Sequence, residues 1–511
     1  MKKNVRNICI GIVFFIMIFI LLLSCQMIKL PNNLDELWNY NTARCIKNGL
    51  IPYKDISMIT TPLLPFLVGL FLKITVDQLF VFRILEALLI TAILIVSFLI
   101  LKKAKVNGFI GLILVSFSTF ILYDETFLDY NFLCLLLLLV IEYLELIKHN
   151  DGKKLDLIIG ILGGLAICTK HTIGTFICIY IVLSEFVLMK KGFFKETLKN
   201  AGIRVIGILI PSVIFLIYLL CTKSFMDFVN YAILGIRTFS NSIKYTELFT
   251  ADSFWVRKLS RILPILFVVL IVFLIINRIV SSIRKKEQST IMRNLTILTI
   301  SSLPMLIALY PISDPTHFLV AVLPLIITME YVVYLILKLI YDKIKFKLKD
   351  FILIVLIAFV LLNISRLIIN EIWINAQNYL KNYNSNNVIN HFDNIILPES
   401  KKERIDILRK FYEEKEQEGY KVIIVDAEAC SNTIPLDVYN KNYDMFLKGN
   451  IGKDGEDGII NDINESHNTI YLLKNKKYSI NWQSPTKVID FIRDNLDYVG
   501  DYDMFEVFYK D

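Results

Sequence analysis

The chain has 511 residues, 55% of them hydrophobic, and its mean hydropathy is +0.57. These values exclude an ordinary water-soluble protein, which must cover its surface with polar and charged residues. The net charge of +8 does not indicate nucleic-acid binding, because Lys and Arg cluster in short loops between apolar runs. The eight cysteines are scattered without a CxxC pair, so the sequence predicts neither a disulfide framework nor a metal cluster.

Apolar runs recur along the first three-quarters of the chain, and most are long enough to cross about 30 Å of hydrocarbon as a helix. They lie near residues 8–29, 79–101, 107–123, 131–148, 155–169, 171–189, 200–221, 259–280, 292–309, 317–340 and 350–372. The first run is longer than the apolar part of a secretory signal and lacks a small-residue cleavage site. The sequence therefore predicts about eleven transmembrane helices.

The loops between these runs alternate in charge. Counted from a cytoplasmic N-terminus, all five loops predicted inside are basic, beginning with residues 102–105. By the positive-inside rule this pattern supports both the count and the orientation. Residues 61–75 are apolar but short, and counting them as a span would reverse the alternation. We expect them to form an interfacial or re-entrant helix.

Several segments are predicted to face outward. They are the loops at residues 30–78, 124–130 and 222–258 and the tail from residue 373. The tail contains a charged helix near residues 401–418 and strand patterns at 421–426 and 469–473, which predict a small α/β domain. Its Gly-rich stretch at residues 448–455 lacks the spacing of a phosphate-binding loop and is predicted to be an ordinary loop.

The expected architecture is an all-α polytopic membrane bundle over residues 1–372, followed by a soluble extracytoplasmic α/β domain over residues 373–511. A multi-pass protein of the plasma membrane with a cytoplasmic N-terminus is expected.

The first outer loop contains an acidic pair, Asp35 and Glu36, at the start of a predicted short helix. Asn33 is a plausible N-cap and Gly49 a plausible C-cap. Because the helix dipole favours carboxylates in the first turn, capping alone explains this pair, and catalysis is the alternative. The next outer loop carries Asp124, Glu125 and Asp129, which are either boundary markers or acid–base groups.

Basic residues follow at other outer boundaries. Lys170 and His171 lie where one apolar run ends and the next begins. Lys170 either snorkels toward the headgroups or clamps a lipid phosphate. His317 begins a later span and is either structural or functional. Arg83 lies near the outer end of the second span, where an ion pair with Glu86 is the simpler interpretation.

The order of these features resembles the GT-C membrane glycosyltransferases, specifically the protein O-mannosyltransferase and aminoarabinose-transferase-like group that uses polyprenyl-phosphate sugars. DELW at residues 35–38, NGLIPY at 48–53 and LAICTK at 165–170 carry most of the resemblance, which covers roughly residues 1–340. It implies a GT-C-like fold.

The resemblance also implies roles for individual residues. Asp35 matches the family's first-loop general base, and Asp129 matches its second-loop acid, with Asp124 and Glu125 as rivals. Lys170 matches a lysine that approaches the lipid phosphate. Where some relatives have Lys-Pro, this chain has Thr61-Pro62, so Lys54 or Arg83 would have to supply that contact. The expected site comprises catalytic Asp35, Asp129 and Glu36 and substrate-binding Lys170, His171, His317, Arg83, Lys54 and Tyr53.

The implied activity is an inverting transfer of a sugar from a polyprenyl-phosphate donor to an acceptor glycan, lipid, cell-wall polymer or protein at the outer face. No nucleotide-binding signature is visible, no cofactor is predicted with certainty, and the sequence leaves a divalent metal open. The main alternative is a lipid-linked saccharide flippase or another transporter, although transporters tend to have midplane charges and repeated halves. A structural or regulatory protein whose tail binds cell-wall polymer is a further alternative.

Overall fold

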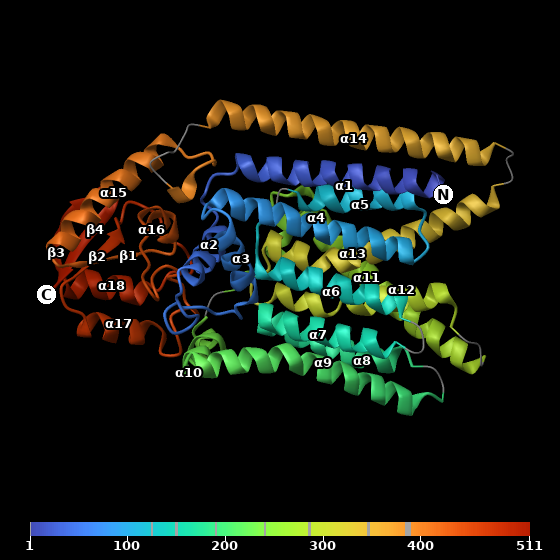
Figure 1. Cartoon of the computed structure of the whole chain (residues 1–511), viewed down its shortest axis with the longest axis horizontal. Coiled ribbons are helices and arrows are strands. Elements are labelled where there is room, and N and C mark those ends of the chain that lie inside the picture. Colours follow the sequence, from blue (N-terminus) through green and yellow to red (C-terminus); the bar gives the residue numbers. More distant parts are fainter. Residues whose placement is uncertain are drawn as a thin grey trace.

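The computed structural model describes residues 2–123, 126–148, 152–189, 192–239, 242–284, 288–344, 348–383 and 390–511. A bundle of long helices carries a compact α/β unit at one end, which we call the domain end (Figure 1). The N-terminus lies toward the opposite, far end of the bundle.

Every one of the eleven predicted apolar runs forms a helix. The helices are α1 (Lys2–Ile28), α4 (Leu79–Lys103), α5 (Gly108–Leu122), α6 (Tyr130–Ile147), α7 (Lys153–Thr169), α8 (His171–Val187), α9 (Phe194–Cys221), α11 (Phe254–Ile283), α12 (Thr290–Ser301), α13 (Pro315–Lys343) and α14 (Lys349–Asn382). In the described ranges, eight helices are long and apolar enough to cross a membrane, α12 being counted with the 3-10 turn Pro304–Leu309 that follows it. The predicted polytopic bundle is confirmed.

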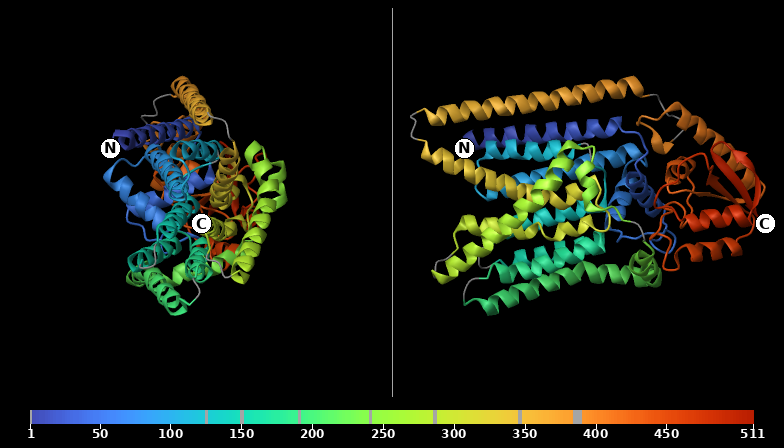
Figure 2. Two further views of the ribbon diagram at one scale, coloured as in Figure 1. Left: turned by 90° about the vertical axis from the view of Figure 1, so that its right-hand side faces the viewer. Right: turned by 180° about the vertical axis from the view of Figure 1, so that it is seen from behind.

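The last helix of the bundle, α14, extends to Asn382, beyond the expected domain boundary at residue 372. It packs along α1 and leaves most of its surface exposed, so it forms the outermost rod of the bundle (Figure 2). An apolar face of this kind suits contact with lipid.

Two short helices, α2 (Leu34–Lys47) and α3 (Leu63–Ile74), lie between the bundle and the α/β unit (Figure 1). The short apolar segment at residues 61–75 forms the helix α3, as predicted. It packs closely on α2 at Gly69, where an added Cβ would lie 2.8 Å from the Ala43 carbonyl oxygen. The segment after α9 folds into α10 (Phe225–Phe228), a π-helical turn (Val229–Leu234) and 3-10 turns (Gly235–Thr238 and Tyr245–Thr250).

The α/β unit begins with a 3-10 turn at Asn390–Phe392. It contains α15 (Glu399–Gln417), β1 (Lys421–Val425), α16 (Cys430–Leu436), α17 (Gly455–Glu465), β2 (Thr469–Lys474), α18 (Thr486–Asn495), β3 (Asp497–Tyr502) and β4 (Phe505–Lys510). The sheet order is β1-β2-β4-β3, with β1 and β2 parallel and the other pairs antiparallel. The predicted small α/β domain, its charged helix and its two strands are confirmed.

Contacts with α2 dock the α/β unit onto the bundle. Arg44 is buried and donates to Asp437 Oδ1 at 2.7 Å and to the Ile434 carbonyl at 3.2 Å. Asn41 Nδ2 donates to Asp444 Oδ2 at 2.9 Å, and both residues are buried. Apolar side chains of α2, α3 and α16 share one core beside these bonds. The α2 helix is therefore held from both sides.

Candidate active site

Asp35 lies in the first turn of α2 without a capping role. The Asn33 side chain accepts the Glu36 N–H at 2.9 Å and caps the helix, as predicted. The partly buried Asp35 carboxylate has no hydrogen bond from any residue in the described ranges. Capping therefore does not explain this carboxylate.

The neighbouring Glu36 is instead locked into an ion pair with Arg83 of α4. Arg83 Nε and one terminal nitrogen donate to the two carboxylate oxygens of Glu36 at 2.7 and 3.0 Å. The same guanidinium donates to the carbonyls of Gln26 and Lys29 at 3.0 and 2.8 Å, and it is completely buried. Arg83 thus pairs with Glu36 rather than with Glu86, and this pair joins α1, α2 and α4.

Asp129 and Lys170 are linked by the side chain of Asn131, which the sequence analysis did not predict as a site residue. Asp129, which is buried, caps α6 by accepting the backbone N–H of Asn131 and its Nδ2 at 3.0 Å. The Oδ1 of the same Asn131 accepts from Lys170 Nζ at 2.9 Å. The Lys170 ammonium also lies 4.7 Å from the ring centroid of Tyr130, a cation–π distance. Lys170 therefore points into the protein and does not snorkel outward.

His317 is held by Asp314 at the start of α13. Asp314 caps this helix, because its Oδ1 accepts the His317 backbone N–H at 2.8 Å. The other oxygen, Oδ2, lies 2.8 Å from His317 Nδ1. The imidazole is therefore fixed in orientation by a residue one helical turn away.

These groups converge on one site at the domain end. Asp35 interacts electrostatically with Asp129, His317, Asp314 and Lys170, which come from three other parts of the bundle. Burial, followed by repulsion from Asp129, raises the pKa of Asp35 to about 7. A carboxyl with such a pKa can take up a proton near neutral pH, as a general base must.

Burial also acts on the two charged neighbours of Asp35. It raises the pKa of Asp129, an effect that Lys170 opposes. It lowers the pKa of the Lys170 ammonium, an effect that Asp129 opposes. Each of the two charges thus stabilises the other in a poorly solvated place.

The other expected site residues, Tyr53, Lys54 and His171, are not among the groups that shift the pKa of Asp35. Tyr53 is buried with a φ of 68° and donates its hydroxyl to the Thr60 carbonyl at 2.7 Å. The Lys54 side chain is exposed, and its carbonyl accepts from Lys441 at 2.6 Å. His171 begins α8, and its Nδ1 is buried without a hydrogen-bond partner among the described residues.

Two rivals for the second acid, Asp124 and Glu125, lie outside the described residues. Within those ranges, no group of three potential ligands has a geometry suited to a metal ion.

Sequence reasoning missed Asn131 and Asp314. An Asp directly before Pro315 is a recognisable helix start, and this signal could have indicated Asp314 as a cap.

A second charged cluster lies at the far end of the bundle. Arg204 of α9 is completely buried and donates to Glu145 at 2.5 Å and to Asp156 at 2.8 Å, and it also pairs with Glu185. Lys148 pairs with Asp156 and Glu185 at 2.7 and 2.6 Å. Ion pairs of this kind let charged residues remain inside a membrane bundle.

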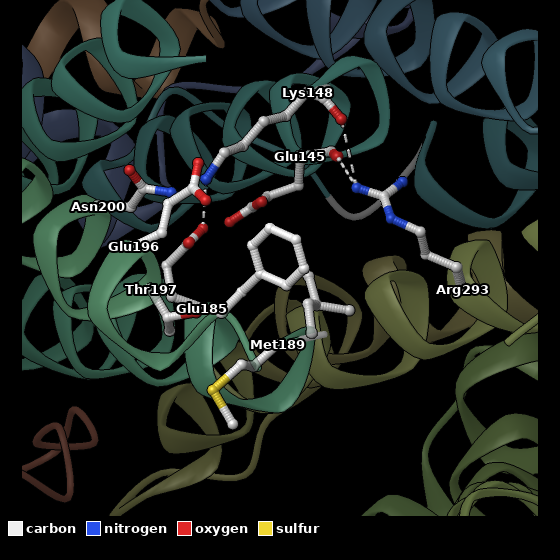
Figure 3. A pocket seen from close by; sticks show the side chains of 10 residues that line it. Glu145, Lys148, Glu185, Met189, Glu196, Thr197, Asn200 and Arg293 are labelled. Atoms are coloured by element: carbon white, nitrogen blue, oxygen red, sulfur yellow. Dashed lines mark hydrogen bonds and ion pairs between the residues drawn. The ribbon is translucent and has the colours of Figure 1, made fainter. Parts of the chain in front are cut away.

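Beside this network is a cavity of about 110 Å³, which Figure 3 shows from close by. Glu196, Asn200 and Arg293 are among its lining residues. Arg293 donates to the carbonyls of Glu145 and Lys148 and so ties α12 to α6. We interpret this cluster as a structural connection between helices.

The chain is a polytopic membrane protein. Its bundle of apolar helices carries a small α/β unit, and a cluster of carboxylates, a lysine and a histidine lies at the end of the bundle near that unit. Its fold is that of the GT-C membrane glycosyltransferases, and the predicted resemblance is confirmed.

The chain is similar to one sequence family and to two structures of one solved protein. Residues 60–220 match the family model described as dolichyl-phosphate-mannose-protein mannosyltransferase. The whole chain is similar to the crystal structure of ArnT from Cupriavidus metallidurans in the apo state, with a TM-score of 0.53, 11% sequence identity, and coverage of 99% of this chain and 97% of that chain. The same protein bound to undecaprenyl phosphate gives a TM-score of 0.54 and 12% identity, with coverage of 98% and 97%. No curated protein sequence matches the chain.

Proposed function

We propose that the protein is a glycosyltransferase that moves a sugar from a polyprenyl-phosphate donor to an acceptor hydroxyl at the outer face of the plasma membrane. The observation that carries this proposal is the Asp35 carboxylate, which accepts no hydrogen bond from the described residues and interacts with Lys170 and His317 at one end of an apolar bundle. A base beside cationic groups suits the deprotonation of an acceptor and the departure of a phosphate. The match to a mannosyltransferase family and the likeness to a lipid-phosphate-bound ArnT support it.

In the proposed reaction, Asp35 accepts the proton of the acceptor hydroxyl while the hydroxyl oxygen forms a bond to the anomeric carbon of the sugar. The bond from that carbon to the phosphate oxygen breaks, and the polyprenyl phosphate leaves with the electron pair. A single displacement of this kind inverts the anomeric configuration. Lys170 and His317 stabilise the charge of the departing phosphate, so positioning and electrostatics supply most of the acceleration.

Asp129 has a positioning role in this proposal. Through Asn131 it holds the Lys170 ammonium inside the site, and its charge favours the protonated lysine. Glu36 and Arg83 have no part in the chemistry that we propose, because they satisfy each other in a buried ion pair. Their contribution is to hold the helix that carries Asp35.

We further propose that the N-terminus is cytoplasmic and that the α/β unit and the Asp35 site are extracytoplasmic. The five basic loops of the sequence support this orientation. The division into a bundle over residues 1–372 and an outer domain over residues 373–511 also remains our proposal, with α14 crossing the boundary. The proposed acceptor is a hydroxyl-bearing glycan, lipid, cell-wall polymer or protein at the outer face.

The orientation can be tested with a single cysteine in the α/β unit. Glu465→Cys places a thiol at an exposed position, in a background in which the native cysteines, of which Cys9 and Cys221 are exposed, are replaced by Ser. An impermeant maleimide should label this variant in intact cells as strongly as in lysed cells. Labelling only after lysis would contradict the proposed outer site.

The function itself can be tested in the organism. Cells that lack the protein should lose one sugar from a surface glycan, glycolipid or glycoprotein, as measured by mass spectrometry. The wild-type chain and the Asp252→Asn control, which changes an exposed carboxylate, should both restore it. Asp35→Asn should not restore it. An unchanged glycan profile in cells without the protein would contradict the proposal.

A further inference from the structure

The Asp314–His317 pair is built so that one imidazole nitrogen is committed and the other is available. Both carboxylate oxygens of Asp314 contact the same residue, one through the backbone N–H and one through Nδ1, each at 2.8 Å. His317 Nε2 has no hydrogen-bond partner within the described part of the chain. The imidazole nitrogen that is available for a hydrogen bond to a ligand is therefore Nε2.

The charges around this imidazole are dominated by carboxylates. His317 faces Asp314 from its own helix start, Asp129 from the start of α6, Asp35 from α2, and Lys170 from the junction of α7 and α8. With the three carboxylates ionised and the imidazole neutral, this group has a net charge of −2. A lipid phosphate would add further negative charge and would be repelled.

A protonated imidazole changes this balance. Asp314 favours that form, because a carboxylate at hydrogen-bond distance stabilises the cation on Nδ1–H. Burial alone would raise the pKa of Asp314, but the hydrogen bonds and the charge of His317 hold it below its ordinary value. Asp314 is thus ionised near neutral pH, as a partner of an imidazolium should be.

We infer that Asp314 is a positioning residue that keeps His317 cationic, so that its Nε2–H donates to the phosphate of the polyprenyl-phosphate lipid. This inference rests on the proposed function and adds to it a residue and a charge state. Together, Lys170 and His317 then supply two positive groups to the phosphate. Asp35 remains available to the acceptor.

The test is the pH dependence of binding of undecaprenyl phosphate to the full-length protein in nanodiscs. Wild-type affinity should fall only slightly between about pH 6 and pH 8, as Asp35 loses its proton. In Asp314→Asn, which retains an oxygen for the helix cap, the imidazole loses the carboxylate that favours its cation, so His317 should be neutral at pH 8. Relative to wild type, Asp314→Asn should bind about tenfold more weakly at pH 8, with a smaller deficit at pH 6.

Two further variants separate charge from folding. His317→Lys keeps a positive charge over this pH range, so adding it to Asp314→Asn should restore the wild-type pH profile. Asp252→Asn should bind as wild type at both pH values. Equal pH profiles for wild type and Asp314→Asn would overturn the inference while leaving the proposed donor site intact. A wild-type protein that binds no undecaprenyl phosphate at any pH would overturn both.

Discussion

Removing Arg83 should destabilise the protein far more than removing an exposed arginine. In Arg83→Met, the Glu36 carboxylate loses both hydrogen bonds that it accepts from Arg83, and the carbonyls of Gln26 and Lys29 each lose one donor. The Glu36 side chain is only 4% exposed, so its carboxylate cannot be rehydrated without opening the structure. Breaking one side of a buried ion pair costs about 3–5 kcal/mol.

The double variant Arg83→Met with Glu36→Gln provides the decisive comparison. It removes the orphaned charge, so it should regain at least about 1 kcal/mol of the loss. Arg284→Met, at an exposed position after α11, should change stability by less than about 0.5 kcal/mol. The assay is unfolding of the purified protein in mixed detergent micelles, followed by tryptophan fluorescence. Equal stability of Arg83→Met and Arg284→Met would refute the assignment of Glu36 and Arg83 to the fold.

Three further predictions concern the site and its support. The rate of transfer should fall as pH drops through about 7, because Asp35 must be deprotonated to act as a base. Asp129→Asn removes a repulsion that raises the pKa of Asp35, so this fall in rate should move to lower pH. An unchanged pH–rate profile in Asp129→Asn would contradict this account. Lys170→Gln should weaken undecaprenyl phosphate binding about tenfold in a nanodisc assay with little change in melting temperature, and unchanged affinity would exclude a phosphate contact. Arg44→Ala should loosen the α/β unit and speed its proteolysis by at least about fivefold, because the hydrogen bonds from the buried Arg44 guanidinium to Asp437 and to the Ile434 carbonyl are lost. An equal rate would show that docking does not depend on Arg44.

Hydropathy and loop charge predicted the bundle because both depend on local properties of the sequence. Each apolar run forms a helix, and the short apolar segment with two prolines forms α3. The tail was harder to predict. Strand β1 is an apolar run and was found, but β3 (Asp497–Tyr502) is largely exposed and polar, so its sequence does not show that it pairs with β4.

Pairing between distant residues was the main part of the site that sequence could not supply. Glu36 and Arg83 form an ion pair although they are 47 positions apart in the sequence, and local spacing suggested Glu86 as the partner of Arg83 instead. Asp35 and Asp129 were predicted to share a face from the count of spans, and their electrostatic interaction supports that placement. Asn131 was missed, because its role depends on the side chain of Lys170 arriving from another loop.

The most direct test of the central claim is transfer by the purified protein in proteoliposomes. A panel of synthetic undecaprenyl-phosphate sugars is supplied with total surface glycolipids and glycans as acceptors, and the release of undecaprenyl phosphate is followed by mass spectrometry. Wild type and Asp252→Asn should release the lipid phosphate at the same rate. Asp35→Asn should lower the rate at least about a hundredfold while melting at the wild-type temperature. A folded Asp35→Asn protein with the wild-type rate would contradict the assignment of Asp35 as the base.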